Sequence, residues 1–141
     1  MNSEEYSNLS QLETEHWFYR GKRAIVRFWI ERYLKLTEHS LLVDCCAGTG
    51  IWALEMSRDC KVLAVDDYEE SIAIARQNLG AARVIKAPCD QLPLEDGTVH
   101  CVTALDVIEH IEDDVAAIRE ISRVIAPEGL LVVTVPALMT L

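Results

Sequence analysis

Five short apolar segments, separated by stretches long enough for a helix, constrain the fold of this 141-residue chain more than any other feature. They are rich in Val, Leu and Ile, without strict alternation of apolar and polar residues. They lie at residues 41–45, 61–66, 83–87, 99–105 and 130–135. Such runs are typical of strands buried on both faces by helices. The sequence therefore predicts an α/β fold, with a doubly wound, mostly parallel sheet of about five strands.

The first 40 residues differ from the rest of the chain in their charge balance, which indicates a separate element. Residues 1–40 hold six basic and six acidic side chains, whereas residues 41–141 hold seven and seventeen. Within this N-terminal segment, four apolar residues recur at helical spacing: Ile25, Trp29, Tyr33 and Leu36. They predict an amphipathic helix over residues 20–36 whose apolar face packs on the body. We expect Lys22, Arg23 and Arg27 to form a solvated face of this helix; the alternative is an anion site.

Composition excludes several classes of protein. The net charge of −10 argues against a nucleic-acid binder, because affinity for phosphate depends on clustered Lys and Arg. No apolar stretch approaches the roughly 20 residues that cross a bilayer. The five cysteines show no paired CxxC spacing, which predicts a reduced, cytoplasmic protein without structural zinc.

The loop after the first predicted strand carries the clearest functional signal. In open α/β sheets, ligands bind beyond the carboxyl ends of the strands. Here the strand runs into a glycine-containing loop over residues 44–50, and Gly48 and Gly50 allow the backbone to approach a ligand closely. Asp66 ends the next strand, and a carboxylate there can accept both hydroxyls of a ribose.

Two classes of cofactor fit this loop. Gly48, Gly50 and Ala53 satisfy a G-x-G-x-x-A pattern, which is typical of NAD(P)-binding oxidoreductases. Asp44, however, is a poor neighbour for a pyrophosphate and a good one for a cationic amino-acid group. The residues alone leave both alternatives open.

Several segments resemble the class I S-adenosylmethionine-dependent methyltransferases. Residues 44–50 resemble the first motif of that family, although Cys46 replaces its first glycine, and Val65-Asp66 resembles the second. Residues 92–97 resemble its "LPF-x-DG" loop, 105–110 its "ldviEH" segment, and 119–129 its "rEi-RvLkPgG" helix and turn. Residues 15–23 are similar to the aromatic and basic lead-in of the small-molecule, "type 11" branch.

The resemblance implies a Rossmann-like sheet, S-adenosylmethionine as cofactor, and methyl transfer to an unidentified small-molecule acceptor. His110 is the candidate general base. Asp106, Glu109 and His110 also resemble a metal-binding set of some relatives, but the further His is missing, so no metal is predicted. The expected cofactor contacts are Asp44, Cys46, Ala47, Gly48, Thr49, Gly50, Asp66, Asp67, Cys89, Asp90, Leu105, Trp17, Tyr19 and Arg20.

Two further expectations concern the ends of the chain. Residues 1–40 form a helical extension in which Trp17, Tyr19 and Arg20 close over the cofactor; in the alternative, Trp17 and Phe18 only pin the helix to the sheet. Residues 41–141 form a core with five strands where the family has seven, so we expect a truncated sheet. Its exposed fifth strand would favour a homodimer. A cofactor-binding fragment without activity of its own is therefore the third functional alternative.

Overall fold

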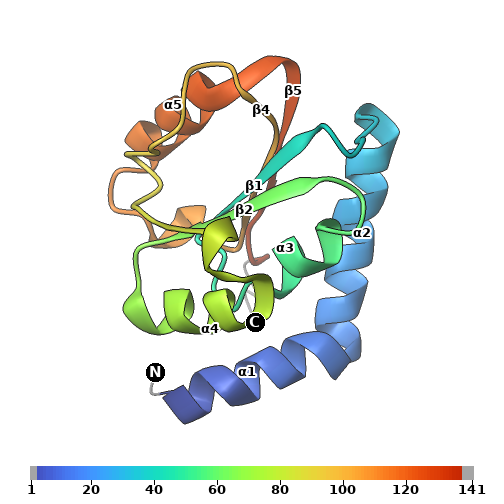
Figure 1. Ribbon diagram of the computed structural model, residues 1–141, viewed down its shortest axis with the longest axis vertical. Helices are drawn as coiled ribbons and strands as arrows, with labels where there is room; N and C mark the ends of the chain where they lie inside the picture. The colour runs from blue at the N-terminus through green and yellow to red at the C-terminus, as the bar shows by residue number, and fades with distance from the viewer. Residues whose placement is uncertain (1–2, 138–141) are drawn as a thin grey trace.

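The computed structural model describes residues 3–137. Its five strands form one parallel sheet, and Figure 1 shows the helices packed around it. The strand order is β3-β2-β1-β4-β5, and every neighbouring pair is parallel. The strands are β1 (Leu41–Cys45), β2 (Lys61–Asp66), β3 (Val84–Lys86), β4 (Val99–Leu105) and β5 (Ile125–Thr134). The predicted α/β fold is therefore confirmed. The fifth strand begins earlier than expected, directly after the preceding helix.

Helices precede the sheet and connect its strands. They are α1 (Ser3–Glu15), α2 (Trp17–Tyr33), α3 (Ile51–Met56), α4 (Glu69–Leu79) and α5 (Asp114–Val124), with short 3-10 turns η1 (Ala81–Arg83) and η2 (Ile108–His110). None of the helices within residues 3–137 is long and apolar enough to cross a membrane. The predicted domain boundary at residue 40 stays a prediction. Residues 1–2 and 138–141, at the ends of the two predicted segments, lie outside the described part of the chain.

Helices cover the sheet on both faces. On one face, Ile30 of α2, Met56 of α3 and Ile72 of α4 share one buried cluster with Leu42 of β1. On the other face, α5 shares a second cluster with the strands, through Ile121. The chain thus switches faces between β1 and β4, and an open α/β sheet binds its ligands at such a point.

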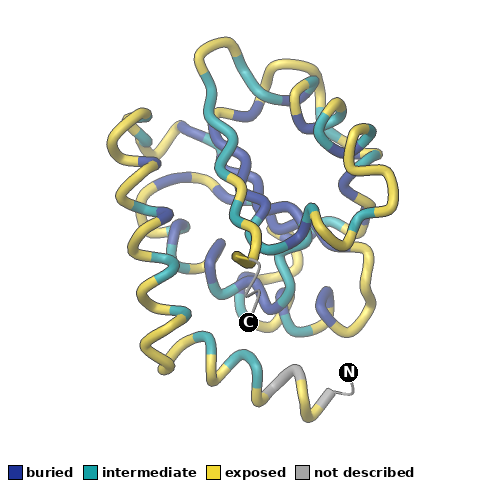
Figure 2. The backbone as a smooth tube through the Cα atoms, turned by 180° about the vertical axis from the view of Figure 1, so that it is seen from behind, coloured by how far each residue is buried: buried dark blue, intermediate teal, exposed yellow. Residues whose placement is uncertain are grey.

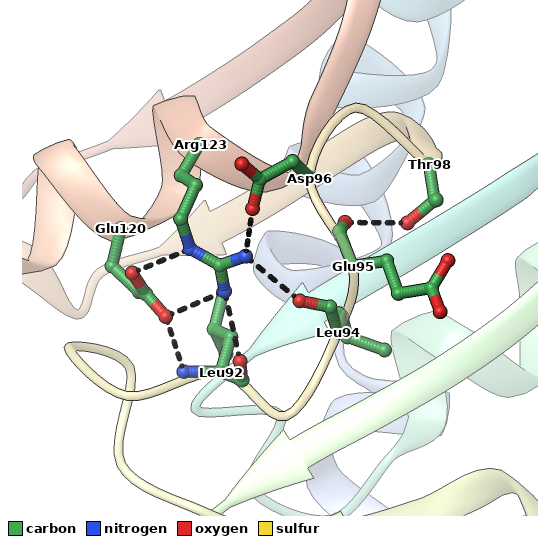
Figure 3. Close-up of polar contacts among 7 residues, drawn as sticks. All are labelled: Leu92, Leu94, Glu95, Asp96, Thr98, Glu120 and Arg123. Carbon is green, nitrogen blue, oxygen red and sulfur yellow. Dashed lines mark hydrogen bonds and ion pairs between the residues drawn. The ribbon is translucent and has the colours of Figure 1, made fainter.

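The segment between β3 and β4 is held by a side chain of α5 rather than by secondary structure of its own (Figure 3). Arg123 donates hydrogen bonds to the backbone carbonyls of Leu92 at 3.0 Å and Leu94 at 2.9 Å. It also forms ion pairs with Glu120 at 2.7 Å and Asp96 at 2.5 Å. Glu120 in turn accepts the N–H of Leu92 at 2.9 Å. Two segments that resemble family motifs are therefore in direct contact.

The prediction of which face of α2 is buried was wrong. Val26 and Ile30 are the buried residues of the helix, whereas Ile25 is 61% exposed, Trp29 44% and Tyr33 66%. Exposed segments alternate with buried and half-buried ones along the N-terminal helices (Figure 2). Apolar side chains occur on two sides of α2, so their spacing alone does not identify the inner side.

Ion pairs explain which side of α2 faces inward. Arg23 pairs with Glu55 of α3 at 2.7 Å, and Arg27 pairs with Asp59 at 2.6 Å. The side chain of Arg23 is only 11% exposed. The basic residues therefore lie between the helix and the acidic body, and the expectation of a solvated basic face was also wrong.

The sheet has two edge strands, β3 and β5, and β5 is the longer of them. Within residues 3–137 this strand pairs only with β4, and the side chains of residues 130–132 are half-buried. A homodimer through this edge stays a prediction.

Candidate functional site

The glycine loop between β1 and α3 has the backbone geometry that its residues imply. Three of its residues adopt positive φ: Cys46 at 51°, Gly48 at 56° and Gly50 at 76°. A Cβ at Gly50 would lie 3.0 Å from Leu79 and 3.2 Å from Ala75, so this glycine lets α3 and α4 pack closely. A Cβ at Gly48 would meet no atom within 4 Å. Gly48 therefore faces open space, as a ligand-binding position requires.

Asp66 at the end of β2 fixes this loop. Its Oδ2 accepts the N–H of Gly48 at 2.9 Å, and its Oδ1 accepts the N–H of Tyr68 at 2.9 Å. Burial raises the pKa of Asp66, and these two hydrogen bonds act in the opposite direction. A carboxylate has about four acceptor positions, so Asp66 can hold the loop and still accept hydroxyl groups of a ligand.

Asp44 at the carboxyl end of β1 belongs to a buried chain of hydrogen bonds. The indole N–H of Trp52 donates to the hydroxyl of Thr103 at 3.1 Å, and that hydroxyl donates to Asp44 at 2.7 Å. Burial raises the pKa of Asp44 to about 7, and the charges of Asp66 and Glu13 add to the shift, against the hydrogen bond from Thr103. A cation bound beside Asp44 would favour its ionised form.

A small cavity of about 120 Å³ lies between the glycine loop and the two N-terminal helices. Lys22 and Arg23 bring two cations to its lining, and Glu13 and Asp44 bring two carboxyls. The hydroxyl of Thr49 donates to the carboxylate of Glu13, which joins α1 to the loop. Burial raises the pKa of Glu13. The cavity thus offers groups of both signs, as a zwitterionic amino-acid group requires.

A larger groove of about 1290 Å³ lies on the other side of the loop. Cys46 and Gly48 line both hollows, so the two meet at the loop. The groove is acidic and has no Lys or Arg among its lining residues within the described chain. Its titratable lining consists of Cys46, Asp66, Asp67, Cys89, Asp90, Asp106, His110, Glu112 and Asp113.

The structure brings most of the predicted site residues to these two hollows. Residues of the small cavity are Asp44, Cys46, Ala47, Gly48, Thr49, Leu105 and Tyr19. Residues of the groove are Cys46, Gly48, Asp66, Asp67, Cys89, Asp90 and His110. Gly50 lies beneath them, against α4.

Two members of the expected lid lie apart from the hollows. Trp17 is 76% exposed and Arg20 is exposed, and neither lines the cavity or the groove. Phe18 is also half exposed, so the alternative in which Trp17 and Phe18 pin α2 to the sheet was wrong.

The predicted cofactor contacts omit several residues that line the two hollows, Glu13, Lys22 and Leu9 among them. Glu13 and Lys22 line the cavity, and Leu9 of α1 lines the groove. Lys22 pairs with Asp106, which also accepts the hydroxyl of Thr134 at 2.8 Å. Within residues 3–137, no three His, Cys, Asp or Glu side chains are grouped as a metal site. For Lys22 one signal was present in the sequence, its place in the aromatic and basic lead-in of residues 15–23.

Comparison with known proteins assigns residues 43–133 to a family described as a methyltransferase domain. An uncharacterized 37.1 kDa protein of a Streptomyces fradiae transposon is 35% identical over 104 residues, covering 70% of this chain and 30% of that protein. A "probable S-adenosylmethionine-dependent methyltransferase" of Mycobacterium tuberculosis is 38% identical over 80 residues, covering 57% of this chain and 29% of that protein. The chain thus spans about 30% of the length of these curated relatives.

Solved structures share the fold. A candidate S-adenosyl-L-methionine-dependent methyltransferase from Methanococcus maripaludis superposes with a TM-score of 0.80 at 18% identity, covering 94% of this chain and 63% of that chain. The [4+2]-cyclase SpnF superposes with a TM-score of 0.69 at 28% identity, covering 80% of this chain and 44% of that chain. At 18% identity, the first likeness shows the fold alone.

Proposed function

The chain belongs to the methyltransferase domain family, the class I S-adenosylmethionine-dependent methyltransferases, and from this membership we propose that it binds S-adenosylmethionine around the glycine loop and transfers its methyl group to a small-molecule acceptor. The observation that carries the proposal is the pair of hollows that meet at Cys46 and Gly48. A buried carboxyl, Asp44, lines one of them, and Asp66 lines the other.

The two hollows fit the two ends of this cofactor. In the groove, Asp66 would accept the ribose hydroxyls, and Cys89 and Asp90 would flank the adenine. In the small cavity, Asp44 would face the ammonium group of the methionine part and Lys22 its carboxylate. Opposite charges are therefore available where a zwitterion needs them. The cofactor supplies an activated methyl group on a sulfonium.

The contribution of the protein to such a transfer is mainly positional. Holding two reactants about 3 Å apart and aligned can supply roughly 7–11 kcal/mol of the barrier. Cys46 and Gly48 line both the cavity and the groove, and Leu105 lines the cavity, so the reacting centre would lie beside Gly48 and Leu105.

His110 is the proposed general base for acceptors that must lose a proton. It lines the groove near the acidic end of α5, and its side chain is exposed enough to exchange protons with water. Such a base typically contributes on the order of 10²–10⁴-fold. We expect His110→Ala to lower turnover while the affinity for S-adenosylhomocysteine stays within about twofold. Equal loss of both would make His110 a structural residue.

The lining of the groove bears on the acceptor. Its carboxylates, without Lys or Arg among the described lining residues, would repel a phosphate backbone, which supports a small molecule over a nucleic acid. The similar proteins differ in function, from probable methyltransferase to [4+2]-cyclase. The likeness to the cyclase, at 28% identity, supports one alternative: a domain of this fold that does not transfer a methyl group.

Calorimetry tests the cofactor, and a ligand series tests its placement. We expect S-adenosylhomocysteine to bind and NAD not to bind; binding of NAD alone would restore the oxidoreductase alternative. Asp66→Ala should weaken binding of S-adenosylhomocysteine at least tenfold, because a buried diol loses a charged acceptor. Adenosine without its ribose hydroxyls should bind the wild type more weakly than adenosine does. Asp66→Ala should bind the two ligands with nearly equal affinity. Additive losses would place the ribose elsewhere.

A further inference from the structure

Two cysteines from distant parts of the sequence meet in the wall of the groove. The Sγ atoms of Cys46 and Cys89 lie 2.9 Å apart, although 43 residues separate them in the chain. Cys46 follows β1 in the glycine loop, and Cys89 follows β3 in the segment held by Arg123. Both residues line the groove. The proposed chemistry of methyl transfer uses neither thiol.

The backbone at Cys46 makes its side chain notable. Its φ of 51° lies in the left-handed region, which favours glycine and is strained for residues that carry a Cβ. The family motif that this loop resembles has glycine at that position. The chain therefore keeps a thiol where a glycine would be less strained, and that thiol points at a second one.

We propose that Cys46 and Cys89 form a reversible dithiol–disulfide pair, oxidised by a small neutral hydroperoxide, that controls access of the cofactor to the groove. The disulfide itself does not depend on the proposed function; its effect on the cofactor does. The bond would tie the loop after β1 to the segment after β3. These are the two walls between which the adenosine part is proposed to lie, so the cross-link would hinder its entry.

The oxidation balances with hydrogen peroxide as the two-electron oxidant. Cys46, the more exposed thiol of the two, loses its proton and its sulfur attacks one peroxide oxygen, which gives a sulfenic acid and releases one water. The Cys89 sulfur then attacks the Cys46 sulfur, the S–S bond forms, and the hydroxyl leaves with the Cys89 proton as a second water. Two external thiols reverse the reaction by thiol–disulfide exchange.

The residues around the two thiols determine which oxidants can reach them and how fast the thiols are oxidised. The acidic groove disfavours anionic oxidants such as oxidised glutathione, whereas hydrogen peroxide is small and neutral. The mutual hydrogen bond and burial raise the pKa of Cys46, and the charges of Asp66 and Asp67 act in the same direction. Because the thiolate is the reactive form, oxidation should be slow at neutral pH and faster at higher pH.

Thiol counting after peroxide treatment tests the pair directly. The reduced full-length chain is treated with hydrogen peroxide, quenched with catalase, unfolded and alkylated, and its free thiols are counted by intact mass. We expect two of the five thiols to be lost and to return after dithiothreitol. In the same samples, calorimetry should show at least tenfold weaker binding of S-adenosylhomocysteine in the oxidised form.

Single variants assign the bond. Trypsin leaves Cys45 with Cys46 on one peptide and Cys89 with Cys101 on another, so a linked peptide alone is ambiguous. Cys46→Gly, which suits the positive φ, and Cys89→Ser should each lose no thiols to peroxide. Cys45→Ala and Cys101→Ala should still lose two.

Three results would overturn the proposal: no loss of thiols in a protein that binds S-adenosylhomocysteine, loss that persists in Cys46→Gly, or a disulfide that leaves the affinity unchanged. Formation of the Cys46–Cys89 bond in a protein that never binds S-adenosylhomocysteine would support the pair and contradict the proposed function instead.

Discussion

The hydroxyl of Thr103 on β4 donates a hydrogen bond of 2.7 Å to Asp44 on β1, at the carboxyl ends of two paired strands. Both residues are buried, and Thr103 also accepts the indole N–H of Trp52. Burial nevertheless raises the pKa of Asp44 to about 7. Near neutral pH the carboxyl is therefore partly protonated, and a cationic ligand must compete with a proton.

That competition predicts a pH-dependent affinity. Binding of the ammonium group of S-adenosylhomocysteine requires ionised Asp44, so each binding event below about pH 7 releases a proton. We expect the affinity to rise by about tenfold or more between pH 5.5 and 7. Calorimetry in two buffers of different ionisation enthalpy would detect the released proton. Between pH 5.5 and 7 an α-amino group, whose ordinary pKa is about 7.7–8.0, stays mostly protonated.

Asp44→Asn is the matched control for the same titration. It keeps the size of the side chain and an acceptor for Thr103 but cannot ionise. Its affinity should be lower than that of the wild type at pH 7 and vary much less with pH. An equal pH dependence in both proteins would place the ammonium group away from Asp44.

The stability of the ligand-free protein should fall as the pH rises through neutrality. Burial raises the folded-state pKa values of Asp44, Asp66 and Glu13, so the folded state binds more protons than the unfolded state above about pH 4. For Asp44 the loss between its unfolded pKa of 3.8 and about 7 is at most about 4 kcal/mol. Carboxyls with lowered pKa values, such as Asp106, are fully ionised by pH 5, so their contribution to folding stability no longer changes above that pH.

Urea unfolding at pH 5 and pH 8 measures this trend. The midpoint of the wild type should be lower at pH 8, and Asp44→Asn should lose less between the two pH values. Equal losses in the two proteins would show that other groups dominate the dependence.

The core of the site could be predicted from the sequence because the sheet itself positions it. Asp44 and Asp66 end neighbouring parallel strands, and the carboxyl ends of such strands share one edge. A strand-loop-helix with two glycines then fixes where a ligand can approach. The periodicity of apolar runs was enough to place these residues together.

The packing of the N-terminal helices on the sheet could not be predicted in the same way. Apolar residues on both sides of α2 gave two possible inner faces, and ion pairs of Arg23 and Arg27 with the α3 region identify the buried one. Glu13 reaches Thr49 across 36 residues, from a helix that carries no motif. Contacts of this kind depend on tertiary packing and leave no local signal in the sequence.

The lid residues separate into one that faces the small cavity and two that do not. Tyr19 lines the cavity, whereas Trp17 and Arg20 point to solvent. We therefore expect Tyr19→Ala to weaken binding of S-adenosylhomocysteine several-fold, because the cavity loses part of its wall. Trp17→Ala and Arg20→Ala should leave the affinity within about twofold, as measured by calorimetry. Losses larger for Trp17→Ala or Arg20→Ala than for Tyr19→Ala would show that α2 rearranges to close over the cofactor.

The contacts of Arg123 predict a local loss of stability with a matched control. Its planar guanidinium reaches two backbone carbonyls and two carboxylates at once, which a lysine ammonium cannot do. Arg123→Lys should lower the urea midpoint and increase proteolysis between β3 and β4, where Cys89 and Asp90 lie. Arg119→Lys, at an exposed position of the same helix, should change neither. If the two variants unfold at the same midpoint, the segment after β3 is held by its own packing rather than by Arg123.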